Sequence, residues 1–209
     1  MKKTKQYLEI ASAVGLLRLT PITPSTIRIS FVKGVTGTIQ DTNWKAQADT
    51  AVTWGAKESR SEVQLLTDRI LIRVEKANGA VQFLSRDGKK LLTENPSEPR
   101  LLLDSQTWNF FAWDKNERLK SKGVLADDFM DLSTKARYIS FGKKKLRMPL
   151  VLSNKGYAIG VAAGSTVLFC NVRTYGQYIY TQGTGQIDYY FIYDENQERN
   201  IEQYRNLPV

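Results

Sequence analysis

The sequence TDRILIRVEKANGAVQFLSRDGKKLLT, residues 67–93, decides the fold class. In its first part, apolar residues alternate with polar or charged ones, which is typical of a strand that buries one face. Asn78-Gly79 and Asp87-Gly88 then supply the positive φ angles that tight hairpin turns require. The stretch therefore predicts three antiparallel strands joined in a meander.

The same alternation continues through most of the chain. Further strand-like runs, separated by turn residues, lie at residues 27–31, 146–152, 157–161, 167–172, 178–181 and 187–193. About ten short strands without long helical patterns between them are typical of a sandwich or barrel, and not of a doubly wound parallel sheet. We therefore predict an all-β fold, an antiparallel β-sandwich, with residues 1–209 as a single domain.

Two segments depart from the strand pattern. Residues 194–207 begin with polar residues that can cap a helix, so we expect a short C-terminal helix that serves as a linker out of the sheet. Residues 42–61 are polar apart from a few apolar side chains that include Trp44 and Trp54. This second segment predicts a long loop or an edge hairpin.

Positive charge is spread along the chain. The 30 Lys plus Arg residues exceed the 21 Asp plus Glu residues and give a net charge of +9. The short basic runs lie far apart, whereas nucleic-acid-binding proteins gather such residues on one face and carry recognisable motifs. We therefore expect no nucleic-acid partner.

The sequence also bears on the compartment. No stretch approaches the roughly 20 apolar residues that span a bilayer, and we find no signal-peptide pattern. Cys170 is the single cysteine, which excludes a disulfide within the chain, and its apolar neighbours predict a buried, inert thiol. We expect a cytoplasmic protein without a membrane partner.

Histidine is absent from the whole sequence. Because its pKa lies nearest neutrality, histidine is the usual general base of nucleophilic triads and a frequent zinc ligand. The sequence therefore lacks the residue on which these two classes of active site usually depend. We expect neither a metal nor another cofactor. Chemistry built on carboxylates, lysine, tyrosine or Ser-Lys pairs stays open.

Two local clusters could carry function. Asp127, Asp128 and Asp131 form the densest acidic group, and glycoside hydrolysis needs a pair of carboxylates. Neighbouring residues in a strand point to opposite faces, so a solvated loop is the favoured interpretation. The aromatic residues between Trp108 and Trp113 could stack on sugar rings, but we favour a place in the core, where aromatic side chains dominate burial.

Residues 65–207 resemble the N-terminal β-sandwich domain of glycoside hydrolase family 31, the α-glucosidases and α-xylosidases. Residues 148–161, MPLVLSNKGYAIGV, are similar to the family's Pro-Phe-x-x-Ser-x-x-Gly-Tyr-Gly segment. Residues 111–123, FAWDKNERLKSKG, are similar to its aromatic-Gly-Leu-Gly-Glu segment, although Ala112, Asp114 and Lys115 depart from that pattern.

This resemblance implies a galactose mutarotase-like supersandwich that belongs to a retaining α-glycosidase. The family's catalytic aspartates lie on a TIM barrel, so the domain would be non-catalytic, pack against that barrel in the same parent chain, and shape the entrance for an α-linked oligosaccharide or glycoside. In the family, a loop of this domain ends in Trp-Asn-x-Asp, and its aspartate reaches the sugar. The corresponding stretch is DFMD, residues 128–131, in which only Asp131 matches, so the resemblance makes Asp131 the candidate substrate-binding residue.

An alternative is a freestanding sandwich that binds carbohydrate or acts as an aldose epimerase. Aldose mutarotases share the architecture, but they typically use histidines to act on the ring oxygen. The absence of histidine therefore counts more against an epimerase than against a simple carbohydrate-binding protein.

Overall fold

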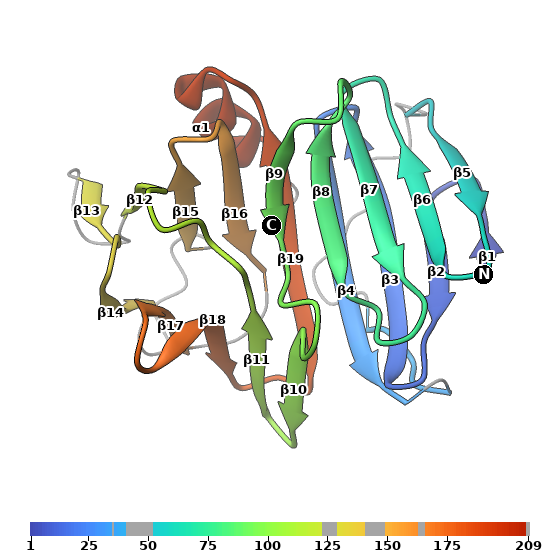
Figure 1. Cartoon of the computed structure of the whole chain (residues 1–209), viewed down its shortest axis with the longest axis horizontal. Coiled ribbons are helices and arrows are strands. Elements are labelled where there is room, and N and C mark those ends of the chain that lie inside the picture. The colour runs from blue at the N-terminus through green and yellow to red at the C-terminus, as the bar shows by residue number, and fades with distance from the viewer. Residues whose placement is uncertain (35, 41–51, 123–128, 141–148, 163–165, 208–209) are drawn as a thin grey trace.

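The computed structural model describes residues 1–34, 36–40, 52–122, 129–140, 149–162 and 166–207. Within these ranges the strands form three antiparallel sheets (Figure 1). The nine-stranded sheet has the order β1 (Lys2–Lys3), β2 (Leu8–Ala11), β3 (Gly15–Thr23), β4 (Thr26–Lys33), β19 (Gln186–Tyr193), β16 (Tyr157–Val161), β15 (Leu150–Ser153), β12 (Leu119–Lys122) and β13 (Phe129–Asp131). One five-stranded sheet has the order β10 (Arg100–Leu103), β11 (Gln106–Phe110), β18 (Gly176–Gln182), β17 (Thr166–Val172) and β14 (Ala136–Ser140). The other has the order β5 (Gly55–Glu58), β6 (Glu62–Leu66), β7 (Ile70–Glu75), β8 (Val81–Ser85) and β9 (Lys90–Thr93).

The two five-stranded sheets lie side by side over one face of the nine-stranded sheet (Figure 1). Side chains from all three sheets meet in one core between these layers. Phe83 of β8, for example, stacks on Phe191 of β19 with ring centroids 4.1 Å apart. A backbone bridge between Glu94 and Phe111 links the two smaller sheets. The predicted all-β sandwich is confirmed.

The hairpins predicted from glycine-containing turns are also confirmed. The meander forms β7, β8 and β9, and β5 and β6 extend it to five strands. Gly79 and Gly88 have φ angles of 75° and 90°, which L side chains rarely adopt. Gly156, with a φ angle of 87°, lies in the turn between β15 and β16.

The polar segment at residues 42–61 is an edge hairpin where the structure describes it. Strand β5 pairs with β6 at the edge of its sheet, so the loop alternative is wrong for this part. Trp54 packs against the core, and the Lys3 Nζ atom lies 4.6 Å from its ring centroid. Residues 42–51, which include Trp44, lie outside the described residues.

Helix α1 (Gln197–Arg205) confirms the predicted C-terminal helix. Asn196 is its N-cap, because the Asn196 side chain accepts a hydrogen bond of 2.9 Å from the backbone N–H of Glu198. The helix buries Tyr204 in a second, smaller core on the outer face of the nine-stranded sheet, above Gly160. This cover explains why β19 is buried on both of its faces.

Two smaller predictions concern single features. Cys170 of β17 is buried, as predicted, and its thiol donates to the carbonyl of Gly176 over 3.5 Å. In the part of the chain that the structure describes, no helix is long and apolar enough to cross a membrane.

Candidate functional site

Asp131 ends β13, the edge strand of the nine-stranded sheet. Its side chain is exposed, and it faces Lys120 of β12 across the pair of strands. The Asp131 carboxylate accepts a hydrogen bond of 3.0 Å from the backbone N–H of Ser133, and this bond lowers the pKa of Asp131 below its ordinary value. Asp131 is therefore an ionised hydrogen-bond acceptor at neutral pH. Asp127 and Asp128 lie outside the described residues.

The hairpin that carries Asp131 has two further groups that sequence reasoning did not single out. Phe129 is 41% exposed, although aromatic side chains are usually buried. The Lys120 Nζ atom lies 4.4 Å from the centroid of the Phe129 ring, within the range of a cation–π interaction. The β12–β13 hairpin thus presents a carboxylate, an aromatic ring and an ammonium group at one edge of the molecule.

The aromatic segment at residues 108–113 divides between two faces of its sheet. Phe111 and Trp113 are 2% and 5% exposed, and their rings stack with centroids 5.0 Å apart. These two residues confirm the predicted place in the core. Trp108 and Phe110 lie on the opposite, outward face of β11 and are only half-buried, so the predicted place in the core is wrong for these two.

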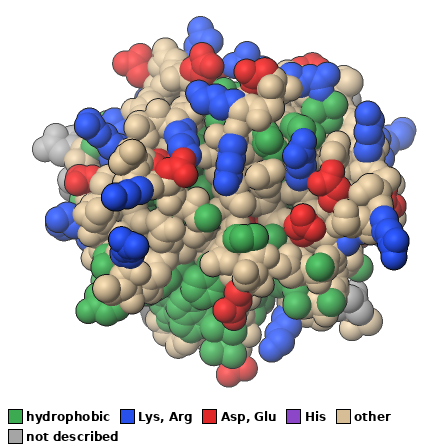
Figure 2. All heavy atoms as spheres, in the orientation of Figure 1, with side chains coloured by type: hydrophobic (Ala, Val, Ile, Leu, Met, Phe, Trp, Pro, Cys, Tyr) green, Lys and Arg blue, Asp and Glu red, His purple; other side chains and the backbone are tan. Residues whose placement is uncertain are grey.

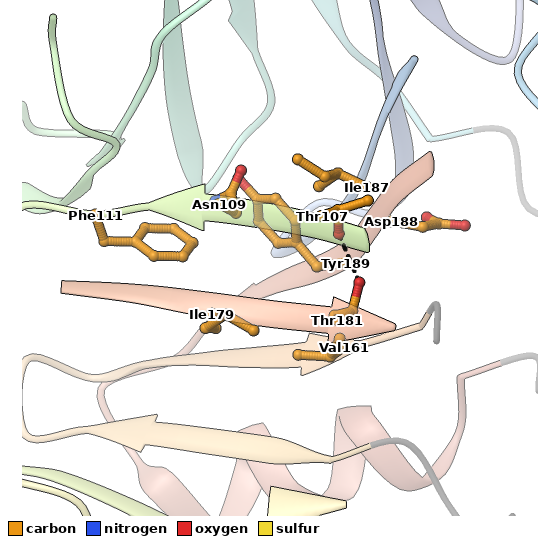
Figure 3. Close-up of a pocket in the computed structure, with 9 residues that line it drawn as sticks. All are labelled: Thr107, Asn109, Phe111, Val161, Ile179, Thr181, Ile187, Asp188 and Tyr189. Carbon is orange, nitrogen blue, oxygen red and sulfur yellow. Dashed lines mark hydrogen bonds between the residues drawn. The ribbon is translucent and has the colours of Figure 1, made fainter. Parts of the chain in front are cut away.

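A cavity of about 20 Å³ lies between the layers, beside β11 and β18 (Figure 3). Thr107 and Thr181 share a hydrogen bond of 2.6 Å at its wall. The amide of Asn109 also lines it and, although buried, has no hydrogen-bond partner in the described protein. This volume accommodates about one water molecule, and ligand pockets are at least ten times larger. The cavity is therefore too small for a sugar ring.

Glu94 is a fully buried carboxylate at the meeting point of the three sheets. It pairs with Arg100 of β10 and accepts hydrogen bonds of 2.9 Å from the backbone N–H of Val81 and from the hydroxyl of Tyr189. Loss of solvent on burial, followed by the charge of Glu94, raises the pKa of Tyr189 well above its ordinary value. The Glu94 carboxylate is therefore bound by groups of the fold itself.

Glu117 is a second buried carboxylate, and it fixes the turn after Trp113 to the β15–β16 hairpin. It accepts a hydrogen bond of 2.6 Å from the hydroxyl of Ser153 and another from the hydroxyl of Tyr157. The Lys155 Nζ atom lies 3.2 Å from its second oxygen. Burial and the neighbouring charge of Glu117 raise the pKa of Tyr157 well above its ordinary value.

Asp188 of β19 is a third buried carboxylate. It accepts a hydrogen bond of 2.8 Å from Arg28 Nε and one of 3.1 Å from the hydroxyl of Ser30. All three buried carboxylates are thus held by hydrogen bonds and cations of the fold. Within the described ranges, no group of three or more Cys, Asp or Glu side chains could hold a metal ion.

Comparison with known proteins gives structural relatives only. Neither a protein-family model nor a curated protein sequence matches the chain. An α-xylosidase of glycoside hydrolase family 31 from a soil metagenome, solved with xylose, matches with a TM-score of 0.78 and 16% identity. The match covers 99% of this chain and 34% of the xylosidase.

Two other enzymes match similarly. The cycloalternan-forming enzyme from Listeria monocytogenes has a TM-score of 0.76 and 15% identity, over 98% of this chain and 21% of the enzyme. The family 31 dextranase from Flavobacterium johnsoniae, complexed with glucose, has a TM-score of 0.75 and 15% identity, over 99% of this chain and 28% of the enzyme.

The chain has the fold of one part of the family 31 enzymes. The resemblance seen in the sequence motifs is thereby confirmed for the fold, and it extends beyond residues 65–207 to nearly the whole chain. The chain spans about a third or less of the family 31 and related chains that it matches.

Proposed function

We propose that this chain is a non-catalytic β-sandwich domain of a retaining α-glycosidase, which packs against a catalytic TIM barrel and helps to shape the substrate entrance. The observation that carries this proposal is the pattern of coverage. The matched enzymes account for nearly all of this chain, while most of each enzyme lies outside the match. A cytoplasmic location and an α-linked oligosaccharide or glycoside as substrate are part of the proposal.

The geometry of the described residues supports a non-catalytic role. Hydrolysis with retention needs two carboxylates about 5 Å apart on either side of a sugar. Glu94, Glu117 and Asp188 are buried and engaged by the fold, and the cavity between the layers is too small for a sugar. We therefore assign the catalytic carboxylates to another domain.

Asp131 is the group that we propose for contact with the substrate. It is exposed and ionised, so it can accept hydrogen bonds from sugar hydroxyls, and the neighbouring Phe129 ring offers an apolar surface. In the full-length enzyme, Asp131→Ala should raise KM by about tenfold, the loss of one hydrogen bond to a charged group. Ser97→Ala, in an exposed turn, is the control. Unchanged KM and kcat in Asp131→Ala would remove this residue from the proposal.

The proposed function is tested with residues 1–209 purified alone. The chain should unfold cooperatively on heating but release no nitrophenol from aryl α-glucosides or α-xylosides. The polypeptide encoded by the complete natural gene should release it. Turnover by a clean preparation of residues 1–209 would contradict the proposal. Calorimetric binding of maltose, isomaltose or a xyloside to this preparation would favour a freestanding carbohydrate-binding protein instead.

A further inference from the structure

The sheet β10-β11-β18-β17-β14 has an apolar row on its outward face. Strand register places the row members directly beside one another: Leu101, Trp108, Tyr180, Leu168 and Tyr138. One side chain comes from each of the five strands, and Tyr138 is 57% exposed. We call this outward side of the sheet the aromatic face. Hydrophobic side chains gather over β10 and β11 in the space-filling view (Figure 2).

The aromatic face carries no charge on its strands. Among the described side chains, the outward positions of these five strands include no Asp, Glu, Lys or Arg. The neighbouring five-stranded sheet behaves differently, since its outward positions include Lys57, Glu62, Arg73, Glu75 and Lys90. Both sheets belong to one chain with 24% charged residues, so composition does not explain the contrast.

An uncharged face rich in aromatic side chains has the composition of an interface core. Such cores are depleted of charged residues and enriched in Tyr, Trp and Phe, whereas monomers rarely leave large apolar patches in water. The aromatic face therefore has the composition of a surface that a partner molecule buries.

The arrangement of the rings favours a protein surface over a sugar as the cover. Trp108 and Tyr180 have ring centroids 4.9 Å apart, and Phe110 and Tyr178 have centroids 5.8 Å apart. Neighbouring strands are themselves about 4.8 Å apart, so these rings pack against each other across the strands. A sugar stacks on a ring face that is open to solvent, and in these two pairs each ring is partly covered by the other.

The area of the aromatic face indicates whether its partner is a tethered domain or a separate protein. Five strands about 4.8 Å apart and about five residues long, at about 3.4 Å per residue, give an area of about 400 Å². Covering it would bury about 800 Å² over both partners, which falls in the range for interfaces between domains of one chain. A stable complex of separate proteins buries at least about 1,200 Å². A tethered domain therefore fits better than a second copy of this chain.

We propose that the aromatic face is the docking surface for the catalytic domain of the parent enzyme. This inference rests on the proposed function and adds to it the side of the sandwich that meets the catalytic domain. The surface of the catalytic domain that covers the face is expected to be apolar and uncharged. In the enzymes matched here, at least about two thirds of the chain lies outside the match, so such a domain is available in each.

Hydroxyl-radical footprinting with mass spectrometry tests this inference, because it labels aromatic side chains individually. Residues 1–209 are labelled alone and within the polypeptide of the complete natural gene, or within the complex with a separately encoded catalytic domain. Labelling of Trp108, Tyr180 and Tyr138 should fall about tenfold in the larger protein, since interface cores are packed like protein interiors. Trp54 and Tyr7, which lie outside the aromatic face, should be labelled equally in both samples.

Charged variants provide the second measurement. Tyr180→Glu, and Tyr138→Glu at a more exposed position, should lower the Tm of the larger protein by roughly 4 °C or more relative to their effect on residues 1–209 alone. Gln82→Glu, opposite Arg73 on the outward side of the other five-stranded sheet, is the matched control and should have no such excess effect.

Each of the following outcomes would overturn the inference. If the domains associate while the three aromatic residues stay fully labelled, docking uses another surface and the proposed function survives. If maltopentaose protects the face of residues 1–209 alone, the face binds carbohydrate. If protection of the isolated chain rises with its concentration, the partner is a second copy. If no catalytic domain exists in the gene or associates with the chain, the proposed function fails as well.

Discussion

The ion pair between Glu94 and Arg100 has a clear energetic role at the scale of single residues. Glu94 is 0% exposed, and its contacts join β8, β10 and β19, one strand from each sheet. Removing one partner of a buried pair leaves an uncompensated charge, so Arg100→Met should lower the free energy of unfolding by about 3–5 kcal/mol. Urea denaturation of residues 1–209 measures this loss.

A matched control for this prediction is Arg73→Met, because Arg73 is an exposed arginine in a strand of the same domain. A surface substitution of this kind should change the free energy of unfolding by less than about 0.5 kcal/mol. If Arg100→Met costs no more than Arg73→Met, the ion pair does not hold the sheets together.

Sequence reasoning did not find these buried polar partners. Glu94 and Tyr189 are 95 positions apart and meet only after two layers face each other. Glu117 and Tyr157 are 40 positions apart and meet only after β12 pairs with β15 beside the β15–β16 hairpin. Period-two patterns predict which side chains point inward, but not which inward residue on another sheet they meet. Asp131 was found through family resemblance, and its contact with substrate stays a prediction.

Helix α1 shows how a local signal and a distant surface combine at the scale of elements. The N-cap at Asn196 satisfies a free backbone N–H of the first turn. Asn196→Ala should therefore lower the free energy of unfolding by about 1 kcal/mol, and Asn196→Ser should restore it. Urea denaturation with both variants checks this, and equal losses in the two variants would contradict a capping role.

Strands β7 and β10 differ in their outward side chains, and only β7 was predicted from the sequence. Strand β7 alternates clearly in its second half, because its outward positions there carry Arg73 and Glu75. Strand β10 reads RLLL, and its outward Leu101 and Leu103 are as apolar as the inward Leu102. In β10 the apolar outward side chains thus removed the alternation by which a half-buried strand is identified. Strands β17 and β18 of the same sheet were nevertheless predicted, from their apolar and aromatic runs. The apolar outward residues that hid β10 belong to the face that we propose for docking.

At the scale of the whole molecule, two buried tyrosines make the free energy of unfolding depend on pH. The hydroxyls of Tyr157 and Tyr189 donate to the buried carboxylates Glu117 and Glu94. Ionising either tyrosine would place a phenolate without solvent beside a carboxylate, and burial is the larger cause of the raised pKa of both groups. The folded domain therefore keeps both protons at pH values where the unfolded chain has lost them.

The direction of the pH effect follows from this difference in bound protons. Below the ordinary tyrosine pKa of 10.0, both states carry the protons and the contribution to stability is complete. Above it, the unfolded chain binds fewer protons, so the free energy of unfolding should fall by about 1.4 kcal/mol per pH unit for each tyrosine. Urea denaturation between roughly pH 9 and 11 measures the slope. Tyr157→Phe should make the slope less steep by the contribution of one tyrosine. Tyr175→Phe, at a side chain that is 75% exposed, should leave the slope unchanged. Equal slopes in the wild type and in Tyr157→Phe would mean that Tyr157 loses its proton as readily in the folded domain as in the unfolded chain, despite its burial against Glu117.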